Sequence, residues 1–215
     1  MRIGTKSVLF GAHCFFLHPF FVFAGWWKLY GFPYDPRLWV AFIVHDLGYW
    51  GKPNMDGPEG ELHPYLGARI MSFLFDKRYR RFNIWRGDFG RGPARPGYIT
   101  YRRTKWHDFT LYHSRFLAKK NEAQYSKLCV ADKLAISLTP AWLYLPMVRA
   151  TGEIKEYMKD TERNSGGSVK VTNSELVWYS AVQDYVRKWV EEHKEIKEDT
   201  WTKDRESVDK NGVWK

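Results

Sequence analysis

Cysteine is scarce in this sequence, with only Cys14 and Cys129 among 215 residues. Both lie in apolar runs, which argues against a disulfide and favours two reduced core thiols in a cytoplasmic protein. An uninterrupted apolar run of about 20 residues is also missing, so we expect no transmembrane helix. The apolar stretch near the N-terminus is broken by His13, His18 and Pro19 and lacks a clear cleavage site, so it does not predict a signal peptide.

Acidic residues are too few to balance the basic ones: 34 Lys and Arg residues face 24 Asp and Glu residues, a net charge of +10. The excess favours an anionic partner: nucleotide, nucleic acid or membrane surface. Nine of the ten net charges fall within residues 77–105, where Asp88 is the one acidic residue among ten basic ones. We interpret this segment as a basic loop insert with a short strand pair around residues 98–101. The basic side chains of this segment either form a solvated surface or belong to a flap that binds phosphates. The ten are Lys77, Arg78, Arg80, Arg81, Arg86, Arg91, Arg95, Arg102, Arg103 and Lys105.

Aromatic residues are plentiful, at 18% with 11 Trp, so the chain can bury a large core. Apolar residues recur with helical spacing, which predicts an all-α helical bundle with an extra C-terminal helix. We expect one domain over residues 1–190 and a charged tail over residues 191–215, in which His193 is exposed. The expected helices cover residues 7–30 (one helix, or two broken near His18), 37–47, 63–75, 106–120, 126–138 and 142–158, and the last begins after Asn173 or Ser174.

The stretch from Ala41 to Gly51 is the centre of the functional prediction. Its apolar run ends in His45 and Asp46, and Gly48 and Gly51 favour a turn that lets both side chains reach one metal ion. Imidazole beside carboxylate suits a borderline divalent metal such as Fe, Mn or Zn. A single His-Asp pair is weak evidence, so the prediction depends on further ligands elsewhere in the chain.

Four more candidate ligands lie on expected helices or at their ends. Asp132 sits in an apolar helix, where an uncompensated carboxylate is costly. His13 competes with His18 for the first position of the set. Six donors exceed what one structural metal needs, and they fit two metals bridged by a carboxylate, an arrangement that clamps an in-line displacement at phosphorus. The four additional candidates are His18, His63, His113 and Asp132.

Five short segments carry a resemblance to a known family. In order they are His18–Ala24, His45-Asp46-Leu47-Gly48, His63–Ala68, Tyr112-His113-Ser114 and Val130–Lys133. They resemble the motifs of the HD-domain superfamily of metal-dependent phosphohydrolases, over roughly residues 18–138. Their order and spacing are similar to the binuclear bacterial YqeK type, which cleaves dinucleoside tetraphosphates symmetrically. The basic insert before His113 and the extra C-terminal helix depart from that pattern.

The resemblance implies hydrolysis of a phosphate ester or anhydride by a hydroxide that bridges two divalent ions. These would be Fe or Mn in the first place, with Zn, Mg, Ni or Co as alternatives. Asp46 would bridge the ions and act in catalysis. Because ligation requires neutral imidazoles, activity should fall at acid pH. One ion would be held by His18, His45 and Asp132, and the other by His63 and His113.

Other charged residues close to these ligands in sequence are candidates for catalysis or substrate contacts. Lys52 could neutralise the leaving group, or be a surface lysine. Glu59 and Glu61 could orient a ligand imidazole, or be solvated. We expect a small-molecule phosphate as partner, above all a nucleotide, with nucleic acid as a further option through residues 77–105 and no membrane partner. The candidates for phosphate contacts are Arg69, Arg102, Arg103, Arg115 and Lys133.

Two other functions fit the same residues. Some HD-domain proteins with this six-ligand pattern resemble mixed-valent di-iron oxygenases that cleave C–C or C–P bonds, and iron with an O₂-dependent product would favour that function. A nucleotide- or nucleic-acid-binding protein with a degenerate site would instead show salt-dependent binding without turnover. The complete ligand set argues against degeneracy.

Overall fold

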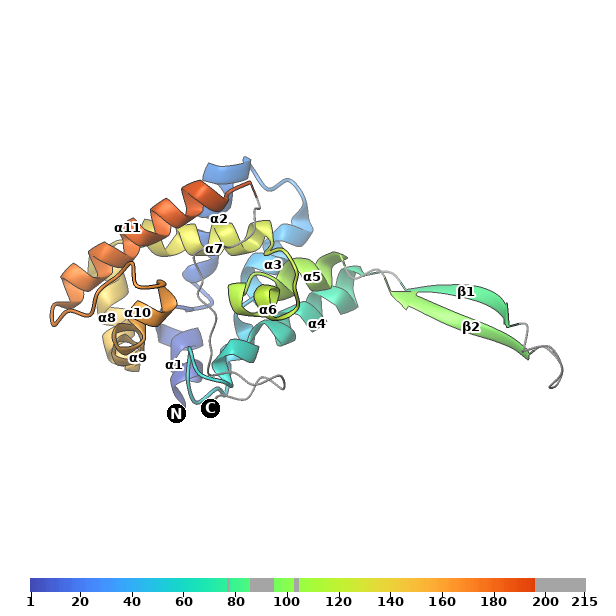
Figure 1. Ribbon diagram of the computed structural model, residues 1–215, viewed down its shortest axis with the longest axis horizontal. Coiled ribbons are helices and arrows are strands. Elements are labelled where there is room, and N and C mark those ends of the chain that lie inside the picture. The colour runs from blue at the N-terminus through green and yellow to red at the C-terminus, as the bar shows by residue number, and fades with distance from the viewer. Residues whose placement is uncertain (77, 86–94, 103–104, 196–215) are drawn as a thin grey trace.

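The computed structural model describes residues 1–76, 78–85, 95–102 and 105–195. Within these residues the chain forms eleven α-helices, two short 3₁₀ helices and one pair of strands. The helices pack into one body, and the strand pair extends away from it (Figure 1). The expected all-α character therefore holds for the body of the molecule, whereas the insert has a different structure.

The described parts of the insert form an antiparallel hairpin, not the loop that we expected. Strand β1 (Arg78–Trp85) pairs with β2 (Arg95–Arg102), so that Tyr79 lies opposite Tyr101. The expected strand pair around residues 98–101 covers only part of β2. We expected a loop because glycine and proline are frequent in residues 77–105. Both strands nevertheless contain aromatic and β-branched residues, which favour β-structure.

The N-terminal third contains three helices: α1 (Ile3–Phe10), α2 (His18–Tyr30) and α3 (Pro36–Val44). The expected break near His18 is confirmed, because Pro19 sits in the first turn of α2. The Asp35 carboxylate caps α3 by accepting a hydrogen bond from the Arg37 amide at 3.0 Å. Helix α3 ends at Val44, three residues earlier than expected, and the 3₁₀ helix η1 (Leu47–Tyr49) follows it.

The middle of the chain runs through η2 (Gly60–Leu62), α4 (Pro64–Phe75), the hairpin, α5 (Lys105–Leu111), α6 (Arg115–Lys120) and α7 (Lys127–Leu138). The expected single helix over residues 106–120 is two helices, because the chain turns at residues 112–114 and Ser114 caps α6. Ser126 caps α7 by accepting a hydrogen bond from the Cys129 amide.

The C-terminal part holds α8 (Ala141–Thr151), α9 (Glu153–Lys159), α10 (Thr161–Asn164) and α11 (Glu175–His193). Gly152, with φ of 86°, separates α8 from α9 within the helix expected over residues 142–158. Ser174 caps α11. Helix α11 takes in the first residues of the predicted tail, and residues 196–215 lie outside the described part. The expectation for His193 was wrong: it is buried and stacks on Trp189 at 4.5 Å between ring centroids.

Helix α7 is the central element of the helical body and is buried on two sides (Figure 1). Leu128 and Ala131 join the cluster formed with α2 and α3, whereas Cys129 and Val130 join the cluster formed with α8 and α11. Cys14 and Cys129 are both buried, and neither forms a disulfide within the described residues. Because apolar neighbours surround α7, its buried Asp132 needs compensating partners.

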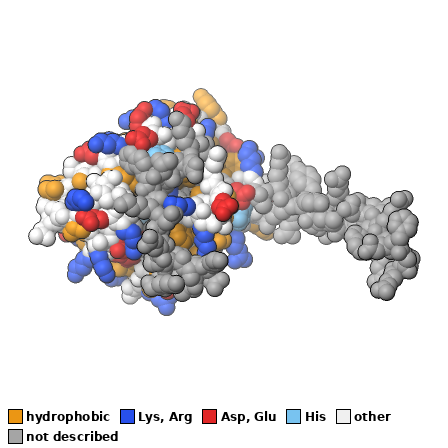
Figure 2. Space-filling model, in the orientation of Figure 1, with side chains coloured by type: hydrophobic (Ala, Val, Ile, Leu, Met, Phe, Trp, Pro, Cys, Tyr) orange, Lys and Arg blue, Asp and Glu red, His pale blue; other side chains and the backbone are white. Residues whose placement is uncertain are grey.

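The surface of the helical body carries interspersed acidic and basic side chains (Figure 2). This agrees with the sequence, since removing residues 77–105 from the count leaves 24 basic and 23 acidic residues. Among the described residues, no single helix is long and apolar enough to cross a membrane, although the bent pair α7 and α8 together meet that criterion.

Candidate metal centre

Six buried side chains from five parts of the chain converge between α2, α3, α4, α5 and α7. The start of α2 and the middle of α7 contribute one ligand each, and the end of α3 contributes an adjacent pair. One histidine directly precedes α4, and another follows the end of α5. All six have less than a tenth of their surface exposed. They are His18, His45, Asp46, His63, His113 and Asp132.

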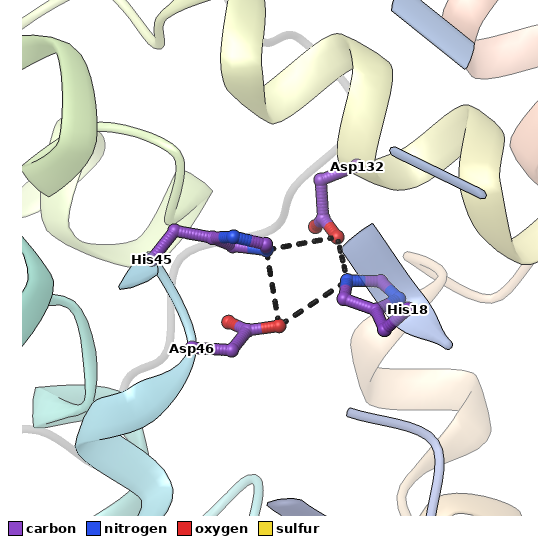
Figure 3. Close-up of side chains that lie close together, drawn as sticks. All are labelled: His18, His45, Asp46 and Asp132. Atoms are coloured by element: carbon purple, nitrogen blue, oxygen red, sulfur yellow. Dashed lines mark hydrogen bonds and ion pairs between the residues drawn. The ribbon is translucent and has the colours of Figure 1, made fainter. Parts of the chain in front are cut away.

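Four of these residues form the first group, and their side chains point toward one another (Figure 3). His18 Nε2 lies 2.9 Å from Asp132 Oδ1 and 3.3 Å from Asp46 Oδ2. His45 Nε2 lies 3.1 Å from the same Asp46 oxygen and 3.7 Å from Asp132 Oδ1. Two imidazole nitrogens and two carboxylate oxygens thus surround one point, as ligands of one cation would.

The second group shares Asp46 with the first and adds two histidines. Asp46 Oδ1 lies 3.4 Å from His63 Nε2 and 3.3 Å from His113 Nε2. The two imidazole nitrogens are 3.1 Å apart. Because the two oxygens of Asp46 face different groups, this carboxylate is placed to bridge two cations. The division into two groups matches the one that the resemblance implied.

The three histidines of the cluster that lie outside α2 share a hydrogen-bonding arrangement that fixes their tautomer. In each, Nδ1 lies within hydrogen-bonding distance of the backbone carbonyl three residues earlier, and a carbonyl only accepts. Nδ1 therefore carries the proton, and the Nε2 of a neutral ring presents a lone pair to the centre. Such carbonyl partners are typical of metal-bound histidines. The pairs are His45 with Phe42 at 3.0 Å, His63 with Gly60 at 2.7 Å and His113 with Thr110 at 2.6 Å.

These residues fit divalent cations on two observations. The lone pairs of His63 and His113 face each other at 3.1 Å, a repulsive arrangement that a cation between them would relieve. In addition, the buried His45 Nε2 and Asp46 Oδ2 lie 3.1 Å apart without a well-oriented hydrogen bond to any described residue, and a cation bound by both would satisfy them. The two overlapping groups could therefore each hold a metal ion.

The electrostatics of the centre favour ionised carboxylates. Burial alone would raise the pKa of Asp46, but the neighbouring imidazoles of His45, His13 and His113 hold it well below its usual value. Burial likewise opposes protonation of His45, yet Asp46 and Asp132 outweigh it and raise the pKa of His45 to about 10. Burial lowers the pKa of His63 to about 4, so this imidazole is neutral at physiological pH.

Glycine allows the backbones around the centre to approach closely. A Cβ atom at Gly48 would lie 1.8 Å from the His63 carbonyl oxygen, and one at Gly67 would lie 2.9 Å from the His45 Cα. Gly48 lies in the 3₁₀ turn that follows α3, as expected, but it has no positive φ, so glycine is needed there for this close contact. Gly51, with φ of 79°, does supply a left-handed turn.

A cavity of about 240 Å³ opens beside the centre and includes five of the six residues in its wall. Of the predicted substrate contacts, Arg115 and Lys133 line it. Lys52 and Arg69 are not among the described residues of its wall, and their predicted roles stay predictions. Arg102 ends β2, with a side chain outside the described part, and Arg103 lies outside it altogether. Glu61 is buried in the wall, whereas Glu59 is exposed and accepts a hydrogen bond from Asn54 at 2.6 Å.

His13, the alternative first ligand, belongs to neither metal group but also lines the cavity. Its Nδ1 lies 2.9 Å from Ser7 Oγ, which in turn donates to the Glu153 carboxylate at 2.5 Å. Glu153 is fully buried and also accepts from Thr151 and Tyr157. Sequence reasoning missed this network, because Glu153 lay inside the single helix expected over residues 142–158 and nothing near it in sequence indicated buried partners.

In comparisons with known proteins, the chain matches no family profile, no curated protein and no solved structure. The structure itself therefore establishes an all-helical body with a buried His/Asp cluster that could bind metal.

Proposed function

We propose that this protein is a binuclear metal-dependent phosphohydrolase of the HD-domain type. The observation that carries the proposal is the Asp46 carboxylate, which directs one oxygen to each of two buried histidine groups. Two divalent ions held by these groups would supply Lewis acidity and activate water for attack at phosphorus. Nitrogen and oxygen donors without thiolate favour Fe or Mn, with Zn, Mg, Ni or Co as alternatives.

The residues of the chain have separate tasks in this function. His18, His45 and Asp132 would hold one ion, and the carbonyl-anchored His63 and His113 would hold the other. The anchoring of each Nδ1 keeps Nε2 aimed at the centre. The aromatic side chains of the cavity wall would limit the access of bulk water to a phosphate bound there.

The substrate that the cavity supports is a small phosphate compound, for which a nucleotide remains our proposal. A cavity of about 240 Å³ suits part or all of a small molecule and is too small to enclose a polymer. The cations Lys133 and Arg115 lie in the same wall as the metal ligands, where phosphate oxygens would meet them.

The test is metal analysis of the purified protein, followed by a screen of phosphate esters and anhydrides with added Mn or Fe. We expect metal-activated release of phosphate, lost by at least about 1,000-fold in His45→Ala and Asp46→Ala while circular dichroism stays helical. The exposed Arg187→Gln serves as the control. Full activity in either site variant would refute the proposal, and an iron-bound protein that forms only O₂-dependent products would identify an oxygenase instead.

A further inference from the structure

Two cations lie directly beside the metal ligands, and neither is needed to hold a metal. Arg115 follows His113 by two residues at the start of α6, and Lys133 follows Asp132 on α7. Both side chains line the cavity. The turn and the helix that deliver two of the metal ligands therefore also deliver two positive charges to the same space.

Asp132 connects the metal centre to these cations. Its Oδ1 faces His18 at 2.9 Å, whereas its Oδ2 accepts a hydrogen bond from Lys133 Nζ at 3.0 Å. Lys133 thus lies one carboxylate group away from the first metal group. An anion bound by Lys133 would sit next to a phosphate that lies on the ions.

Arg115 is held in place by helix α11 and the segment before it. Its guanidinium lies 5.0 Å from the ring centroid of Trp189 and donates to the Tyr185 hydroxyl at 3.1 Å. It also contacts the Asn164 carbonyl at 3.4 Å. A stacked and hydrogen-bonded guanidinium loses little further freedom when an anion binds it, which favours recognition of phosphate oxygens.

Arg115 and Lys133 both line the cavity, although they come from different helices. Two like charges facing one cavity are unfavourable in the free protein. A bound anion would relieve this repulsion.

The charge of the cavity wall indicates how much negative charge a ligand should carry. Among its described residues, three cationic side chains (Arg115, Lys133, Arg163) accompany four carboxylates. Two divalent ions would therefore leave the wall with an excess of three positive charges. A phosphate monoester carries about two negative charges, so a second anionic group would match the wall better.

We propose that Arg115 and Lys133 form an anion subsite beside the metal centre, and that the substrate carries a second phosphate group next to the phosphate that reacts. This inference rests on the proposed hydrolase function and specifies its substrate class as a diphosphate or longer phosphate chain. Phosphate is favoured over carboxylate because two cationic groups and three excess charges suit a group that carries more than one negative charge.

The experiment compares three non-hydrolysable probes by calorimetry with the Mn²⁺-loaded, desalted protein. They are methylphosphonate, methylenediphosphonate and phosphonoacetate. We expect the diphosphonate to bind at least about tenfold more tightly than the monophosphonate, as for added charge-assisted contacts. In Arg115→Gln this ratio should fall to about threefold or less, with the monophosphonate affinity unchanged. Arg187→Gln, an exposed arginine that does not line the cavity, should keep the ratio.

Several outcomes would overturn the subsite. These are a wild-type ratio near one, a ratio that Arg115→Gln leaves intact, or an equal loss of affinity for both probes. Phosphonoacetate binding as tightly as the diphosphonate would overturn the assignment to phosphate. If Arg115→Gln does not fold, Lys133→Gln is used in its place, with the same expected fall in the ratio and the same refuting outcome.

Failure of the subsite and failure of the hydrolase function give different results. Arg115-dependent diphosphonate binding without any phosphate release would support the subsite and refute the hydrolase. Equal turnover of monoesters and diphosphates, with no preference among the probes, would support the hydrolase and refute the subsite.

Discussion

Asp46 faces the two histidine groups with different oxygens, and this single residue decides whether the site can hold one cation or two. Oδ2 approaches His18 and His45, whereas Oδ1 approaches His63 and His113. The charges of this buried cluster therefore couple proton binding to metal binding.

Metal binding should release protons, because His45 is protonated in the metal-free protein. Its raised pKa of about 10 means that the metal must displace a proton at neutral pH. The apparent metal affinity should therefore rise by up to about tenfold for each pH unit between pH 6.5 and 8.5. Calorimetry in two buffers of different ionisation enthalpy measures the released protons. Affinity that is independent of pH, without proton release, would contradict the assignment.

The raised pKa of His45 also makes the stability of the metal-free protein depend on pH, in the direction opposite to the metal affinity. A group whose pKa is higher in the folded than in the unfolded state stabilises the fold fully below the unfolded value of about 6.5. For His45 this contribution is lost as the pH rises toward 10. Chelated protein should thus become less stable in mild alkali, whereas metal-loaded protein should not.

Glu153 should contribute strongly to stability, because its carboxylate is buried and accepts from Ser7, Thr151 and Tyr157. Glu153→Ala leaves these donors unsatisfied and should lower the free energy of unfolding by about 3 kcal/mol. Chemical denaturation measures this change, with the exposed Glu162→Ala as the control. An equally small effect of both substitutions would show that the network contributes little.

The pKa of Glu153 predicts where its contribution is lost. Burial raises it, but hydrogen bonds from His13, Ser7 and Thr151 bring it below its usual value. Its stabilisation is therefore present above about pH 4.5 and is lost as the pH falls through the lower folded value. Acid should accordingly destabilise the wild type more than Glu153→Gln.

At the scale of the element, the hairpin is separable from the helical body. The Asp76 carboxylate closes its base by accepting hydrogen bonds from the amides of Trp106 at 2.9 Å and His107 at 3.0 Å. Helix α5 is thereby capped by the residue that follows α4. These two hydrogen bonds join α4 to α5 directly at the base of the hairpin.

Replacing residues 78–103 by a short Gly-Ser linker should therefore leave metal binding intact and change the melting temperature by only a few degrees. The variant loses most of the excess positive charge, so any salt-dependent binding of nucleic acid should disappear with the hairpin. Thermal melting, metal analysis and a fluorescence binding assay measure the three properties. Loss of bound metal in this variant would show that the hairpin supports the centre.

Sequence reasoning located the helices that carry the ligands better than it located their ends. Periodic apolar residues and capping residues such as Ser126 and Ser174 predicted α7 and α11 well. The turn at residues 112–114 was missed, because local helical propensity continues through it and the turn is what brings His113 to the centre. Gly152 indicates the end of a helix, but the periodic apolar pattern around it predicted one continuous helix over residues 142–158.

At the scale of the whole molecule, the spacing of six donors predicted a convergence that the fold produces. The sequence could not predict the cavity, because its wall is assembled from segments between residues 12 and 189, including parts of α2, α7 and α11. It also misplaced His193, whose burial against Trp189 depends on packing between α11 and the rest of the body. The alternating charges from residue 191 onward predicted a solvated tail. Such a pattern carries no information about tertiary contacts.

The number of metal ions bound per chain tests the central claim most directly. After loading with Mn²⁺ or Fe²⁺ and removal of loosely bound ions, elemental analysis should give two ions per chain, one for each group. Asp46→Ala, which removes the shared ligand, should bind fewer than one while remaining helical. A folded wild-type protein that binds no metal, or an Asp46→Ala variant that still binds two ions, would contradict the account.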